Sequence, residues 1–224
     1  MDVRVCYTAY CVNDWADIMR RHMRMLRDSV LSEYDADVSV FAYPYTRDVL
    51  SAVDELGSSC SVYAVGANMF EFPALRSLVD RPADANLYFH TKGASVPVDG
   101  ERKPGERRWN DDMCYFNIGM CSTCVPYLKE YDGCGIAFKI EKLYGDHVGC
   151  GYYAGNFWWS TGRHLRGLQD SRFIRAPVDR FDAERMVGGS RGSFMSLWMP
   201  RGGLWGNDHD SGEKTLNPTV YIIP

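Results

Sequence analysis

The sequence predicts an α/β protein with a mixed central β-sheet flanked by helices. Strand-type and helix-type segments alternate three times before His90, a pattern typical of a mostly parallel sheet with right-handed crossovers. Beyond Gly133 the segments become shorter and glycines more frequent, as expected where such a sheet adds an antiparallel edge. The 224 residues contain no evident repeat or linker, so we expect one domain over residues 1–224.

Four strands are expected early in the chain, where β-branched and aromatic residues form short apolar runs. These runs are Val3–Tyr10, Val38–Ala42, Cys60–Val65 and Asn86–His90. Apolar residues at helical spacing predict helices between them over Trp15–Leu26, Val49–Leu56 and Phe72–Leu78. Asn13 is expected to cap the first helix, and the second is expected to end near Gly57.

After the fourth strand the pattern changes. Residues 94–108 are rich in proline, glycine and charged residues, and we expect them to form a long exposed loop. Helical spacing then resumes with Trp109, Met113, Phe116 and Met120. A later helix is expected to open with the acidic residues around Asp182.

Composition excludes several classes of protein. The formal net charge of −4 argues against nucleic-acid partners, which require a basic face. We expect the basic residues of the first helix to form a solvated face: Arg20, Arg21, Arg24 and Arg27. No apolar run is long enough for a membrane span, and no signal peptide is visible, so we expect a cytoplasmic protein that is not secreted.

The eight cysteines are expected to be mostly reduced thiols, since no secretion signal is visible. Cys121 and Cys124 form a C-x-x-C, with His147 and Cys150 downstream, which is the ligand set of a structural zinc site. The second half is not a matching pair, and the C-x-x-C lies in a helix-like segment. We therefore interpret these residues as buried thiols.

The sequence around the fourth strand is the most informative for function. This strand ends in His90-Thr91-Lys92-Gly93, and ligands of open α/β sheets bind at the carboxyl ends of strands. A histidine and a lysine there suit an anionic ligand or its metal; alternatively, they are polar strand-end residues facing water. No glycine-rich dinucleotide motif, P-loop or serine nucleophile elbow follows a strand, so a pyrophosphate would have to be held by a metal or by basic side chains.

Carboxylates offer candidate metal ligands and catalytic groups. Asp84-Ala85-Asn86 is nearly an Asp-x-Asp motif, although it precedes its strand and could be a turn. Asp208 and His209 lie in a polar turn rich in metal-type ligands. Asp182 and Glu184 are candidate catalytic or acceptor-binding groups, or else favour a helix dipole.

Aromatic residues could form a sugar platform or part of the core. Phe157, Trp158 and Trp159 follow Gly155-Asn156, which suggests close approach of the backbone to a ligand.

These motifs occur in a recognisable order. Tyr88-Phe89-His90-Thr91-Lys92-Gly93, Trp109, Met113–Asn117, Gly155–Trp159 and Glu184 resemble the "HTKG" glycosyltransferases of bacteria and large DNA viruses over roughly residues 1–210. Among these the chain is similar to the N-terminal glycosyltransferase domain of a multidomain chlorovirus protein of capsid-glycan synthesis. The resemblance implies a GT-A fold, with a Rossmann-like nucleotide-binding half over 1–93 and an acceptor and metal half over 94–224.

The resemblance also implies a reaction. The expected activity is transfer of a sugar from a UDP-sugar, UDP-L-rhamnose or UDP-glucose, to a glycan acceptor, with retention of configuration and a Mn²⁺ or Mg²⁺ ion. The oligomeric state is left open. Two alternatives of another class are a non-catalytic carbohydrate-binding protein and a structural protein on a decayed transferase fold.

The resemblance assigns roles to individual residues. Those expected at the uridine are Thr8, Ala9, Tyr10 and Asn68. His90 and Lys92 are expected to face the pyrophosphate, with Lys92 also stabilising the leaving group. The implied metal ligands are Asp84, or Asp208 and His209. Asn156 and Trp158 should lie near the donor sugar or the acceptor, and Asp182 or Glu184 near the reacting centre.

Overall fold

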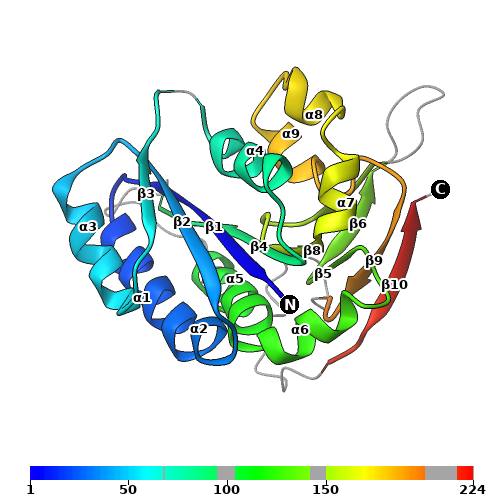
Figure 1. Cartoon of the computed structure of the whole chain (residues 1–224), viewed down its shortest axis with the longest axis horizontal. Helices are drawn as coiled ribbons and strands as arrows, with labels where there is room; N and C mark the ends of the chain where they lie inside the picture. Colours follow the sequence, from blue (N-terminus) through cyan, green and yellow to red (C-terminus); the bar gives the residue numbers. More distant parts are fainter. Residues whose placement is uncertain (68, 95–103, 142–149, 200–215, 224) are drawn as a thin grey trace.

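The expected α/β class with a mixed central sheet flanked by helices is confirmed. The computed structural model describes residues 1–67, 69–94, 104–141, 150–199 and 216–223. Within these ranges, eight strands form one sheet in the order β10-β9-β5-β8-β4-β1-β2-β3, and β6 and β7 form a small second sheet. Helices cover both faces of the large sheet (Figure 1).

The four strands expected early in the chain all form, and all are parallel. β1 lies between β2 and β4, and β3 pairs with the outer side of β2. Their bounds are β1 Val3–Tyr10, β2 Ala36–Tyr43, β3 Ser61–Ala64 and β4 Ala85–His90. Because the strands run the same way, their carboxyl ends meet at one edge, and His90 and Tyr10 therefore lie at the same edge of the sheet.

The later strands add the expected antiparallel pairs to the sheet, although β5 and β9 run parallel to each other. β8 runs antiparallel to both β4 and β5, and β10 runs antiparallel to β9. The bounds are β5 Gly133–Gly135, β6 Phe138–Glu141, β7 Cys150–Tyr153, β8 Trp158–Thr161, β9 Gly192–Ser196 and β10 Thr219–Ile223. Since β8 pairs directly with β4, the segment beginning Gly155-Asn156 returns to the edge where β4 ends.

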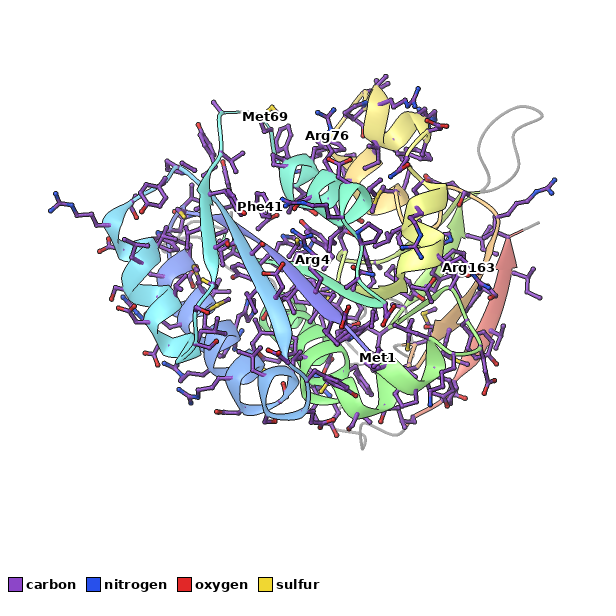
Figure 2. The ribbon with its side chains drawn as sticks, viewed as in Figure 1. Met1, Arg4, Phe41, Met69, Arg76 and Arg163 are labelled. Atoms are coloured by element: carbon purple, nitrogen blue, oxygen red, sulfur yellow. The ribbon has the colours of Figure 1, made fainter. Side chains whose placement is uncertain are left out.

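The helices divide between the two faces, and each face has its own apolar core (Figure 1). One face carries α1 Trp15–Asp28, α2 Val30–Glu33, α3 Arg47–Val53 with the 3₁₀ turn Asp54–Leu56, α5 Pro104–Cys114 with the π turn Tyr115–Gly119, and α6 Cys121–Tyr127. The other carries α4 Phe72–Asp80, α7 Gly162–Gly167, α8 Arg172–Arg175 and α9 Phe181–Arg185. Side chains fill the space between the helices and the sheet (Figure 2). On the second face, Arg76 links α4 to α8 by donating to the Ile174 carbonyl at 3.0 Å.

Two local expectations are wrong. Asn13 does not cap α1: its backbone has φ 52°, and its side chain donates instead to the Ala94 carbonyl at 2.7 Å. Residues 94–108 are not all loop, because α5 begins at Pro104. Proline suits a first helical turn, where its missing N–H costs no hydrogen bond.

The expectations for cysteines and arginines are confirmed. All eight cysteines are free, and Cys121, Cys124 and Cys150 are buried. The α1 arginines each pair with a carboxylate at the surface, as in Arg24 with Glu55 at 3.2 Å. In the described part of the chain, no helix combines the length and apolar character needed to cross a membrane.

Candidate functional site

In the turn after β4, the Thr91 side chain is buried in the fold, whereas the His90 and Lys92 side chains on either side of it are partly exposed. The Thr91 N–H extends the sheet by donating to the Thr8 carbonyl at 3.0 Å, and the Lys92 N–H donates back to the His90 carbonyl at 2.7 Å. The buried Thr91 hydroxyl accepts from the Tyr10 N–H at 2.8 Å. Gly93 has φ 90°, where any side chain would strain the backbone. Thr91 therefore anchors the turn, and His90 and Lys92 flank it.

Lys92 meets one of the predicted catalytic carboxylates. Its Nζ lies 3.9 Å from Oε1 of Glu184 on α9, and the two side chains are 30% and 25% exposed. The cation and the carboxylate are thus close without being sealed from water. This arrangement leaves Lys92 accessible to an anionic ligand.

His90 is oriented by the segment before β8. Its Nε2 lies 3.0 Å from the Gly155 carbonyl, and since a carbonyl only accepts, Nε2 carries the proton. The other ring nitrogen, Nδ1, lies 3.8 Å from Oε1 of Glu71. His90 therefore turns Nδ1 toward a carboxylate.

Glu71 is a site residue that sequence analysis missed. It stands at the N-terminal end of α4, and its Oε2 accepts hydrogen bonds from the Tyr88 hydroxyl at 2.9 Å and from Asn156 Nδ2. Burial, together with the Glu71 charge, raises the pKa of Tyr88 well above its usual value. Glu71 is one carboxylate in a surface-type segment, so no spacing or motif in the sequence distinguishes it.

Asn156 and Trp158 lie behind the site and support it. Both are fully buried, and Asn156 Oδ1 accepts from Trp158 Nε1 at 2.7 Å. Asn156 Nδ2 also donates to the Ala183 carbonyl of α9 at 3.3 Å, besides Glu71. With no exposed surface, these two residues join β8, α4 and α9 and hold His90's neighbour Glu71 in place.

The two carboxylates of α9 have different surroundings. Asp182 is buried, accepts from the Val178 N–H at 2.7 Å, and lies 3.5 Å from Arg185 and 4.0 Å from Arg172. Residues two positions apart on a helix do not face the same way. Asp182 thus pairs with arginines inside the fold, and Glu184 is the one that reaches Lys92.

Of the residues expected at the uridine, Tyr10 offers the accessible surface. Thr8 and Ala9 are buried, whereas Tyr10 is 42% exposed. Its ring stacks with that of Tyr43 at the end of the adjacent strand, with centroids 6.2 Å apart and planes 18° apart. The paired rings form an aromatic surface at the edge that carries the His90–Lys92 turn. Asn68 lies outside the described residues.

Asp84 does not join this site. It precedes β4, at the opposite edge of the sheet from His90, and its Oδ2 accepts from the Asp2 N–H at 3.0 Å. The chain advances six residue steps from Asp84 to His90, about 20 Å at about 3.3 Å per residue. The other expected metal ligands, Asp208 and His209, lie outside the described residues. The residues that the structure describes contain no group of three His, Cys, Asp or Glu able to hold a metal.

Comparison with known proteins reveals structural similarity only. No protein-family model matches the chain, and no curated protein matches it. The chain is similar to the bifunctional IspDF of Campylobacter jejuni (8% identity, TM-score 0.44), covering 87% of this chain and 48% of that one. It is also similar to a 4-diphosphocytidyl-2C-methyl-D-erythritol synthase of Anaerococcus prevotii (10% identity, TM-score 0.43), covering 82% of this chain and 80% of that one. A third similar structure is the glycosyltransferase GlyE of Streptococcus pneumoniae (11% identity, TM-score 0.40), with 82% of this chain and 42% of that one covered. The chain thus spans about half of IspDF, and likeness at this level assigns no activity.

Proposed function

We propose that this protein is a glycosyltransferase that moves a sugar from a UDP-sugar to a glycan acceptor. The observation that carries the proposal is the meeting, at one edge of the sheet, of an accessible lysine, an oriented histidine and a stacked tyrosine pair. A nucleoside diphosphate offers an aromatic base and an anionic group, which match these two kinds of surface.

In this proposal the tyrosine pair, Lys92 and Glu184 have separate tasks. The Tyr10 and Tyr43 rings lie against the uracil base, and Lys92 meets the diphosphate. As the glycosidic bond breaks, negative charge grows on the leaving diphosphate, and a lysine held at that position stabilises it. Glu184, beside Lys92, lies near the reacting sugar.

A divalent cation is part of the proposal but has no ligand set among the described residues. Asp84 is at the wrong edge, so Asp208 and His209 are the remaining candidates from the sequence. A bound Mn²⁺ or Mg²⁺ would add positive charge at the diphosphate.

The finer features of the proposal rest on the resemblance of the motifs. They are a retaining reaction, UDP-L-rhamnose or UDP-glucose as the donor, and a role in viral capsid-glycan synthesis. The alternative of a carbohydrate-binding protein would use tryptophan and tyrosine side chains as a sugar platform. Trp158 and Trp159 are fully buried, which disfavours them as a sugar platform.

Calorimetric titration with UDP, with and without Mn²⁺, tests the proposal. We expect UDP to bind the native chain and Lys92→Ala to weaken that binding by about tenfold, equivalent to 1.4 kcal/mol. Lys129→Ala, at an exposed lysine after α6, removes the same charge elsewhere and should leave binding unchanged. A Lys92→Ala protein that binds UDP as well as the native chain would overturn the assignment of this site.

If UDP binds, transfer from UDP-rhamnose and UDP-glucose to glycan acceptors is measured next. Binding without transfer to any acceptor would favour the decayed-transferase alternative. Binding of glycans that is indifferent to UDP would favour the carbohydrate-binding alternative.

A further inference from the structure

We infer that Asn110 is a positioning residue that sets the direction of Lys92 by holding the backbone of the His90–Lys92 turn. The inference rests on the proposed function in treating Lys92 as the group that meets the diphosphate. Beyond that function, we infer that polar side chains of α1 and α5 hydrogen-bond to one another and hold this turn in place.

The turn is held by two carboxamides from outside β4. Asn110 Nδ2 donates to the Lys92 carbonyl at 3.0 Å, and Asn13 Nδ2 donates to the Ala94 carbonyl at 2.7 Å. These two bonds lie on either side of Gly93, whose φ of 90° makes it the most permissive point of the turn. With both carbonyls held, the Cα–Cβ direction of Lys92 is fixed, although its side chain can still move.

The orientation of the Asn110 carboxamide is determined by its partners. Its Oδ1 accepts from Arg21 Nη2 at 2.6 Å, and a guanidinium can only donate. A flipped carboxamide would place its NH₂ group against that guanidinium and its oxygen against the Lys92 carbonyl. The observed orientation is therefore the one in which Asn110 donates to Lys92.

A buried histidine supports the same orientation. His22 Nε2 lies 3.3 Å from Asn110 Oδ1, and its Nδ1 lies 3.1 Å from the Tyr7 hydroxyl. Burial, with Arg21 nearby, lowers the pKa of His22 to about 3, so the ring is neutral and carries one proton. The Tyr7 hydroxyl donates to Nδ1, and Nε2 carries the proton and faces Asn110 Oδ1. Cys114 Sγ lies beside this pair, 3.2 Å from Nε2, and donates to the same Asn110 oxygen at 3.6 Å.

Calorimetry with UDP on a double-mutant cycle tests this role. We expect Asn110→Ala to weaken UDP binding by about fivefold in the native background and to have no further effect in a Lys92→Ala background. A merely structural contribution would weaken binding in both backgrounds. Asn117→Ala is the matched control, because Asn117 is also a buried asparagine donating to a backbone carbonyl, that of Met113 at 2.9 Å, and should leave UDP binding unchanged.

Hydrogen exchange of the Ala94 amide provides a readout that does not involve UDP. This amide donates to the Thr91 carbonyl at 3.2 Å within the turn, so Asn110→Ala should speed its exchange and Asn117→Ala should not. If Asn110→Ala fails to fold, Arg21→Gln replaces it, since Arg21 is partly exposed and its loss frees the same carboxamide.

The outcomes separate the inference from the proposed function. If Lys92→Ala weakens UDP binding but Asn110→Ala does not, or weakens it equally in both backgrounds, the inference is overturned and the proposed function stands. If Lys92→Ala leaves UDP binding intact, the proposed function fails. In that case Ala94 exchange decides whether Asn110 holds the turn: faster exchange supports it, and unchanged exchange overturns it.

Discussion

Glu184→Gln should strengthen UDP binding while slowing sugar transfer. In the free protein, the Glu184 carboxylate is the resident counter-ion of Lys92, with Oε1 and Nζ 3.9 Å apart. An arriving diphosphate must compete with Glu184 for Lys92, and it is repelled by the negative charge of Glu184 as it approaches. Replacing the carboxylate with a carboxamide of equal size removes both effects, and also removes a charge proposed to lie near the reacting sugar.

The magnitude follows from the geometry. Two unit charges about 4 Å apart interact by about 1 kcal/mol in bulk water and about 4 kcal/mol at an effective dielectric constant of about 20. The side chains are 30% and 25% exposed, so water screens the pair and the lower figure applies. About 1 kcal/mol corresponds to roughly a fivefold tighter dissociation constant for UDP.

The assay is calorimetric titration with UDP at about 0.05 M and about 0.5 M salt, because screening should shrink the gain at the higher salt. Glu33→Gln, an exposed carboxylate on α2, makes the same change in net charge and should have no effect. Unchanged or weaker UDP binding by Glu184→Gln at both salt concentrations would refute the competition between Glu184 and the diphosphate.

Two further predictions concern stability. His22 is buried with a folded-state pKa of about 3, below its unfolded value of 6.5, so the unfolded chain binds more protons and stability is lost as pH falls between these values. His22→Gln should therefore reduce, by about 1.4 kcal/mol per pH unit, the loss of unfolding free energy as the pH falls. Urea unfolding of both proteins from about pH 6 to pH 4 measures this loss. An equal pH dependence of the native and His22→Gln proteins would contradict the prediction. Glu71→Ala should cost about 2 kcal/mol, because Tyr88 and Asn156 lose a shared acceptor, whereas Glu71→Gln, which retains an acceptor oxygen, should cost less than about 1 kcal/mol. Equal costs in urea unfolding would contradict that reasoning.

Several features of the site were predictable because they depend on short stretches of sequence. The alternation of strands and helices and the position of His90 and Lys92 at the end of β4 follow from local apolar patterns. The resemblance of motifs placed Lys92 at the pyrophosphate and Asp182 or Glu184 near the reacting centre, and the fold brings Lys92 Nζ to 3.9 Å from Glu184 Oε1. The roles of these residues stay a prediction.

Other features depend on how distant segments meet, which no local pattern records. Trp158 was a candidate ligand contact, but the pairing of β8 with β4 places it in the core. Asp182 was a candidate catalytic group, but the fold surrounds it with two arginines. Asp84 was a candidate metal ligand, but the direction of β4 puts it at the far edge from His90.

The sequence by itself determined the class of fold and the strand end at which polar groups gather, because apolar periodicity acts over a few neighbouring residues. Tertiary structure alone decided which groups surround that strand end. Glu71 reaches Tyr88 and Asn156 across 17 and 85 positions, and Asn110 reaches His22 across 88. Such contacts follow from strand order and helix packing, so they become visible only when the chain is folded.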